Sequence, residues 1–73
     1  MSDVISGVVK WFNTTKGFGF ISTESYGDVF VHYQDIKSDG FRNLKEGQIV
    51  SFVLENGAKG ARAHEVTVLQ DPF

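Results

Sequence analysis

The strict alternation of apolar and polar residues over short runs most constrains how this chain can fold. In 28–32, DVFVH, Val29 and Val31 lie on one face of an extended chain and Phe30 lies on the other; 49–55, IVSFVLE, alternates in the same way. A repeat of two residues is typical of a strand with one buried face. The chain contains no convincing stretch with the 3.6-residue period of a helix. The sequence therefore predicts an all-β protein.

Five such runs are predicted to be strands, and turn residues separate them. Valine and phenylalanine dominate the apolar residues while leucine is scarce, which favours strands. NGAKG at 56–60 is a hairpin signal between the last two runs. Five short strands without a helix long enough to cover a sheet favour a closed barrel, which leaves no exposed edge. The predicted strands are 5–13, 18–23, 28–32, 49–55 and 62–69.

Length and composition narrow the class of protein. Its 73 residues favour a single domain over 1–73, with a structured core at about 5–69. The chain has no cysteine, so neither a disulfide nor a thiolate metal site can form. We see no signal peptide and no run of about 18 apolar residues that could span a membrane. We therefore expect a cytoplasmic monomer that does not bind membranes.

Aliphatic residues take the inner face of the second and third predicted strands. Ile21 and Val31 alternate there with the phenylalanines. With the aliphatic residues inside, the rings that point outward are Phe18, Phe20 and Phe30. The opposite assignment would bury these rings together with an aspartate carboxylate, which is costly unless the charge is paired. The predicted core is Val9, Ile21, Val29, Val31, Ile36, Val50, Phe52, Leu54, Val66 and Val68.

Outward aromatic rings beside lysines suit a single-stranded nucleic acid. Lys10 and Lys16 are the only basic residues among the first 36, and they lie on either side of Trp11. Bases stack on rings, phosphates pair with cations, and base edges bond to polar groups. The net charge of -2 argues against binding held mainly by charge. We therefore expect stacking to carry the binding, and truncation of an outward ring to cost little stability.

Two motifs carry a resemblance to a known family. GVVKWFNTTKGFGFI at 7–21 resembles the first ribonucleoprotein-type motif of the bacterial cold-shock proteins, and DVFVHYQDI at 28–36 resembles the second. The resemblance continues through LKEGQIVSF at 44–52 and GAKGARAHEVTVL at 57–69, so it covers essentially the whole chain. An RNA-recognition motif also carries a string like KGFGFI, but its βαββαβ fold needs helices that this sequence does not predict.

The resemblance implies an all-β fold, a five-stranded antiparallel OB-fold barrel (cold-shock domain). It implies binding of single-stranded RNA and DNA, with a preference for pyrimidine-rich strands. It also implies an RNA chaperone that traps unpaired strands and regulates transcription or translation. The chain departs from the family at Ala61, where proline is common, at His64, where a small residue is usual, and at Glu65, where asparagine is usual; Arg62 adds a charge. These departures bear on loop rigidity and fine specificity.

Aromatic residues form the first part of the predicted binding site. The stacking residues are Trp11, Phe18, Phe20, Phe30 and His32. Tyr33 and Phe41 either extend this surface or anchor loops against the barrel. Phe12 is either an edge of the surface or a core residue, since neighbouring residues of a strand face outward together only at a bulge.

Polar residues form the second part of the predicted site. Lys10 and Lys16 are predicted to contact phosphates. Asp28 either accepts hydrogen bonds from bases or is a carboxylate at a turn, and Asn13 bonds either to the turn backbone or to a base. The residues predicted to flank the far end of the groove are Lys59 and Arg62.

Other classes of function find little support in the sequence. Two histidines on separate strands with no cysteine do not make a metal site, and we expect no cofactor. No nucleophile elbow and no acidic metal cluster is present, so we do not expect an enzyme. The alternative that remains is a protein-interaction barrel whose aromatic surface docks a proline-rich or apolar peptide.

Overall fold

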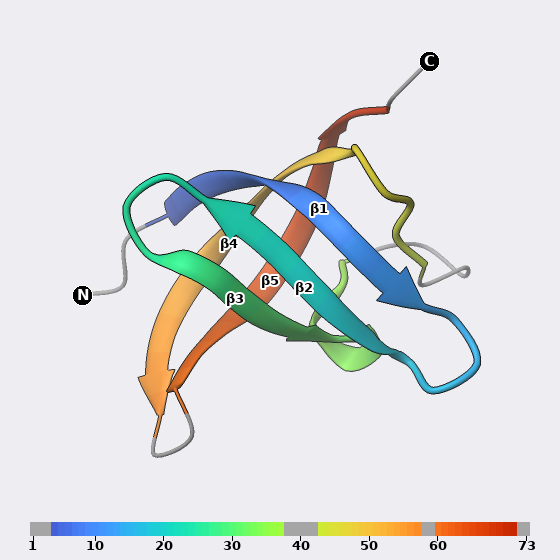
Figure 1. Ribbon diagram of the computed structural model, residues 1–73, viewed down its shortest axis with the longest axis horizontal. Helices are drawn as coiled ribbons and strands as arrows, with labels where there is room; N and C mark the ends of the chain where they lie inside the picture. Colours follow the sequence, from blue (N-terminus) through green and yellow to red (C-terminus); the bar gives the residue numbers. More distant parts are fainter. Residues whose placement is uncertain (1–3, 38–42, 58–59, 72–73) are drawn as a thin grey trace.

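The computed structural model describes residues 4–37, 43–57 and 60–71, which form a closed five-stranded barrel (Figure 1). A 3-10 turn, η1 (Tyr33–Asp35), follows the third strand. In the described part of the chain, no helix has the length and apolar character needed to cross a membrane. The strands are β1 (Val4–Asn13), β2 (Phe18–Thr23), β3 (Gly27–His32), β4 (Ile49–Gly57) and β5 (Gly60–Gln70).

The strand order around the barrel is β1-β2-β3-β5-β4. Figure 1 shows β1, β2 and β3 as one curved layer, with the β4–β5 pair crossing behind it. The pairs β1–β2, β2–β3, β1–β4 and β4–β5 are antiparallel, whereas β3–β5 is a short parallel contact at Phe30 and Arg62. The predicted five-stranded barrel is confirmed, and closure through a parallel pair is a detail that the hairpin pattern did not reveal.

The barrel interior is filled mainly by branched aliphatic side chains. Phe52, at 1% exposed, is the one aromatic residue among the fully buried side chains of the described residues. Leu54 packs against this core while partly exposed, and Leu44 and Ala63 join it although the alternation did not predict them. The predicted core residues confirmed as buried are Val9, Ile21, Val29, Val31, Ile36, Val50, Phe52 and Val66.

Val68 was predicted to be a core residue, and this prediction is wrong, because it is 37% exposed. The alternation of β5 breaks at Glu65, which has a positive φ of 51°. Near it the β4–β5 register shifts, so that Ala63 and Val66 both point inward although three positions separate them. Val68 lies beyond this break and beside a second register shift. The break at Glu65 does not itself account for Val68, since Val66 lies beyond it and is fully buried as predicted. Val68 is exposed because β5 is uncovered from Thr67 to Gln70, where every residue is exposed.

Candidate nucleic-acid interface

Four aromatic side chains gather on the outer face of β1, β2 and β3. Trp11 lies opposite Phe20 across the β1–β2 pair, and Phe20 lies opposite Phe30 across the β2–β3 pair. Directly paired residues of neighbouring strands point to the same face of a sheet. The register therefore builds a surface that we call the aromatic platform, which consists of Trp11, Phe18, Phe20 and Phe30.

The four rings of the aromatic platform contact one another. The ring centroids of Trp11 lie 5.8 Å from Phe18 and 5.4 Å from Phe20. Those of Phe30 lie 5.9 Å from Phe18, in a stacked arrangement, and 5.8 Å from Phe20, in an edge-on one. These separations fall in the range in which aromatic pairs attract each other. The rings hold one another in place, and each remains partly exposed to solvent.

The outward assignment of the phenylalanines is confirmed, although the rings are only partly exposed. Phe18, Phe20 and Phe30 are half-buried, and Trp11 is 38% exposed. Gly19 is buried between the two rings of β2, as expected for the inner side of that strand. Since each ring packs against its neighbours, truncating one removes real contacts. The expectation that such a truncation costs little stability therefore needs revision.

A bulge in β1 determines that Trp11, and not Phe12, faces outward. The β1–β2 register shifts between Val9 and Trp11, so the chain gains one residue and Trp11 turns outward. Phe12 then lies opposite Gly19 and packs against the core. A Cβ on Gly19 would lie 2.2 Å from the Trp11 carbonyl oxygen, so only glycine fits beneath β1 here. Of the two roles left open for Phe12, the structure places it on the core side, away from the aromatic platform.

The cations at the aromatic platform differ in whether they are paired. Lys10 Nζ lies 2.9 Å from Asp28 Oδ2. The sequence indicated separate roles for these two residues, whereas in the structure they form an ion pair with each other. Lys16 forms no ion pair within the described part of the chain. Its backbone N–H donates to Asn13 Oδ1 at 2.9 Å, so the Asn13 side chain holds the β1–β2 turn. Of the two lysines, Lys16 is therefore the one that is not paired with a carboxylate of the described residues.

His32 and Tyr33 continue the surface past Phe18. His32 lies opposite Phe18, and its ring centroid is 4.5 Å from that of Tyr33. His32 Nδ1 accepts a hydrogen bond from the Gln34 N–H at 3.3 Å, and Asp35 Oδ2 accepts one from the His32 N–H at 3.0 Å. This reciprocal cap fixes η1 and the His32 ring.

Arg62 reaches the aromatic platform from β5. Its Cζ lies 5.9 Å from the Phe30 ring centroid, within the range of a cation–π contact. Its Nε and Nη2 donate to Asp35 Oδ2 and Oδ1 at 3.1 and 3.3 Å. Phe41 and Lys59, the other two predicted site residues, lie outside the described residues.

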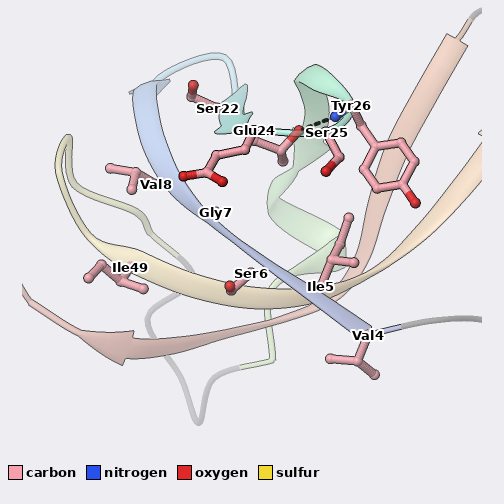
Figure 2. A pocket seen from close by; sticks show the side chains of 11 residues that line it. Val4, Ile5, Ser6, Gly7, Val8, Ser22, Glu24, Ser25, Tyr26 and Ile49 are labelled. Carbon is pink, nitrogen blue, oxygen red and sulfur yellow. Dashed lines mark hydrogen bonds between the residues drawn. The ribbon is translucent and has the colours of Figure 1, made fainter.

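A hollow on another side of the barrel is a poorer candidate site. It lies between β1 and the β2–β3 turn, where Figure 2 shows Glu24, Ser25 and Tyr26 across from Ile5 and Ser6. Tyr26 supplies its single ring, and none of the described residues that line it is a cation. A nucleic acid needs both stacking surfaces and positive charge, so the aromatic platform suits it better.

Comparisons with known proteins identify the family. Residues 5–69 match the family described as the 'Cold-shock' DNA-binding domain. The chain is 56% identical over 69 residues to the major cold shock protein CspA of Pseudomonas aeruginosa, with 94% of this chain and 100% of the relative covered. It is 62% identical over 60 residues to the cold shock protein CspC of Bacillus subtilis, with 82% and 91% covered.

The chain belongs to the cold-shock domain family. This is a family of nucleic-acid-binding proteins and not of enzymes. The structure is also similar to Drosophila Unr CSD456, with a TM-score of 0.69 at 18% sequence identity, covering 92% of this chain and 27% of that one. At this identity the likeness supports the fold alone, a cold-shock domain of the OB type.

Sequence reasoning missed Asp35 in this cold-shock domain. Its side chain is 7% exposed and binds Arg62, and its Oδ1 also lies 3.3 Å from His64 Nδ1. His64 Nε2 in turn lies 3.3 Å from Glu55 Oε1. Arg62 and His64 therefore meet at one buried carboxylate. The available signal was the spacing of His32 and Asp35, which is that of a capping pair.

Proposed function

We propose that this cold-shock domain binds single-stranded RNA and DNA on the aromatic platform and acts as an RNA chaperone. The observation that carries the proposal is the mutual packing of four outward-facing rings on three adjacent strands. Stacking on such rings is worth about 1–3 kcal/mol per base and tolerates different sequences. A few stacked bases can therefore sustain binding although the chain carries a net charge of -2.

The proposed site has an aromatic and a polar part. Trp11, Phe18, Phe20, Phe30 and His32 stack bases, Tyr33 and Phe41 extend the surface, and Lys16 meets phosphate. Lys10 and Asp28 act as a pair, in which the carboxylate can accept from a base while the ammonium offsets its charge. Lys59 and Arg62 flank the far end. Asn13 shapes the turn.

The chaperone mechanism needs no nucleotide hydrolysis and no catalytic residue. A protein that binds only unpaired strands shifts the equilibrium of a weak RNA hairpin towards its open form. The protein would act as a monomeric single domain, residues 1–73, in the cytoplasm. It would favour pyrimidine-rich strands and affect transcription or translation through the RNA structures that it melts.

Titration of Trp11 fluorescence tests the binding proposal. Trp11 is the only tryptophan and is part of the aromatic platform, so a stacked base should quench its emission. We expect saturable quenching by oligothymidine and weaker binding of oligoadenine. Opening of a fluorophore- and quencher-labelled RNA hairpin by the same protein tests the chaperone role. No response to either nucleic acid, together with binding of a proline-rich peptide, would favour the protein-interaction alternative.

A further inference from the structure

A groove continues the aromatic platform beyond Phe30. The rings of Phe20 and Phe30 form one wall, and the ends of β4 and β5 form the other. The charged side chains that line the groove are Asp28, Glu55 and Arg62. The groove thus combines a stacking surface with hydrogen-bonding groups of both kinds.

Arg62 enters this groove with its orientation already fixed. Asp35 uses two of its donors, one on Nε and one on Nη2. A guanidinium has five N–H donors in a planar fork, so three are left for a ligand. The Asp35 carboxylate accepts from His32 and Arg62 and also lies 3.3 Å from His64 Nδ1, so it serves as an anchor. Because the fork is held in advance, little side-chain freedom is lost when a ligand binds.

Two carboxylates at the groove keep spare acceptor capacity. Asp28 uses Oδ2 to bind Lys10, and Glu55 has Oε1 at 3.3 Å from His64. The other oxygen of each carboxylate has no hydrogen bond among the described residues. Both side chains are open to solvent, at 47% and 69% exposed. A ligand at the Phe30 ring therefore meets donors from Arg62 and acceptors from these two residues.

Guanine is the base whose edges match this arrangement best. Its Hoogsteen edge carries two adjacent acceptors, O6 and N7, and a bidentate arginine on these atoms is the commonest specific contact to a base. Its Watson–Crick edge adds two adjacent donors, N1–H and N2–H, which suit a carboxylate. Cytosine, adenine and uracil each present a single donor group, so none of them offers such a donor pair to the carboxylates.

We propose that the groove beside Phe30 is a guanine-selective subsite in which Arg62 binds O6 and N7 and the carboxylates of Glu55 and Asp28 accept from N1–H and N2–H. The subsite rests on the proposed function, since it needs a strand lying on the aromatic platform. It gives one position of a pyrimidine-rich strand a preference for guanine.

The test compares heptathymidine with strands that carry one guanine at each position in turn, using Trp11 fluorescence. In the wild-type protein we expect one position to raise affinity about 5- to 150-fold, the value of a bidentate base contact. Replacing that guanine by 7-deazaguanine, which lacks N7, or by inosine, which lacks the N2 amino group, should remove much of the gain. These comparisons use the unaltered protein and so do not depend on whether a variant folds.

Three variants test whether the rise in affinity for guanine arises in the groove. Arg62→Lys keeps a cation beside Asp35 but lacks the planar fork, and it should reduce the guanine gain to near one, with no further effect of 7-deazaguanine. Glu55→Gln should reduce the effect of inosine. Lys45→Gln removes a charge from an exposed residue outside the groove and should leave the gain intact.

Two failures have different meanings. If heptathymidine does not bind, the proposed function fails. If it binds and no position prefers guanine, or if Arg62→Lys keeps the preference, the subsite alone is overturned.

Discussion

Replacing Phe30 by alanine separates binding from stability at the aromatic platform. Phe30 contacts Phe18, Phe20 and Arg62, but its ring does not pair with Trp11, so the fluorescent reporter keeps its own ring contacts. Loss of one stacking surface should weaken oligothymidine binding by about 1–3 kcal/mol, which is about 5- to 150-fold in Kd.

The same change should also destabilise the fold. Two aromatic pairs are lost, each worth about 0.5–1.5 kcal/mol, together with one cation–π contact, worth about 0.5–1 kcal/mol. Because Phe30 is only half-buried, we expect a net loss of about 2 kcal/mol in the free energy of unfolding, below the about 3–5 kcal/mol of a buried phenylalanine. This value replaces the small cost that the sequence suggested.

Val31→Ala is the matched control. Val31 is the next residue of β3, fully buried on the opposite face, and its truncation removes two methyl groups for a similar cost of about 2 kcal/mol. Thermal unfolding followed by circular dichroism measures both losses, and titrations are done where both variants are folded. We expect weak binding only for Phe30→Ala. Equal weakening in the two variants, or unchanged binding by Phe30→Ala, would refute the assignment of the binding face.

Three further predictions concern single positions. Gly19→Ala should lower the free energy of unfolding by more than about 3 kcal/mol, because its Cβ would lie 2.2 Å from the Trp11 carbonyl oxygen. A variant that melts at the wild-type temperature would show that β1 can move away from this Cβ. Glu65→Asn should raise the free energy of unfolding by about 0.5–1 kcal/mol, because asparagine tolerates the positive φ of 51° better, and a lower melting temperature would contradict this. Lys16→Gln should reduce the magnitude of the salt slope of oligothymidine binding by about 0.7, measured as log affinity against log salt; an unchanged slope would mean that Lys16 meets no phosphate.

The β-barrel and the outer face of β2 and β3 could be predicted because both depend on local patterns. Alternation within 18–23 and 28–32 fixes which side chains share a face, whatever the strands later pair with. Glycine-containing turns mark where one strand ends and the next begins. The same reasoning left Phe12 open, because a bulge depends on the partner strand and shifts the alternation by one residue. It failed at Val68, because alternation does not show where the end of a strand is left uncovered.

Charge pairing at the site could not be predicted from the sequence. Lys10 and Asp28 are 18 residues apart, and Arg62 and Asp35 are 27 residues apart. Contacts over such separations arise only when the barrel closes. The sequence therefore named Lys10, Asp28 and Arg62 as separate ligand contacts, whereas the structure joins the first two and anchors the third to a buried carboxylate.

Alternation is local to each strand, so the sequence was enough to predict a five-stranded barrel with mainly aliphatic residues inside and with Phe18, Phe20 and Phe30 outside. Only the folded barrel shows which rings meet, that Trp11 and not Phe12 joins them, and that Arg62 is held beside Phe30. Register, bulges and ion pairs are properties of two strands together. No single segment holds that information until the barrel brings its partner beside it.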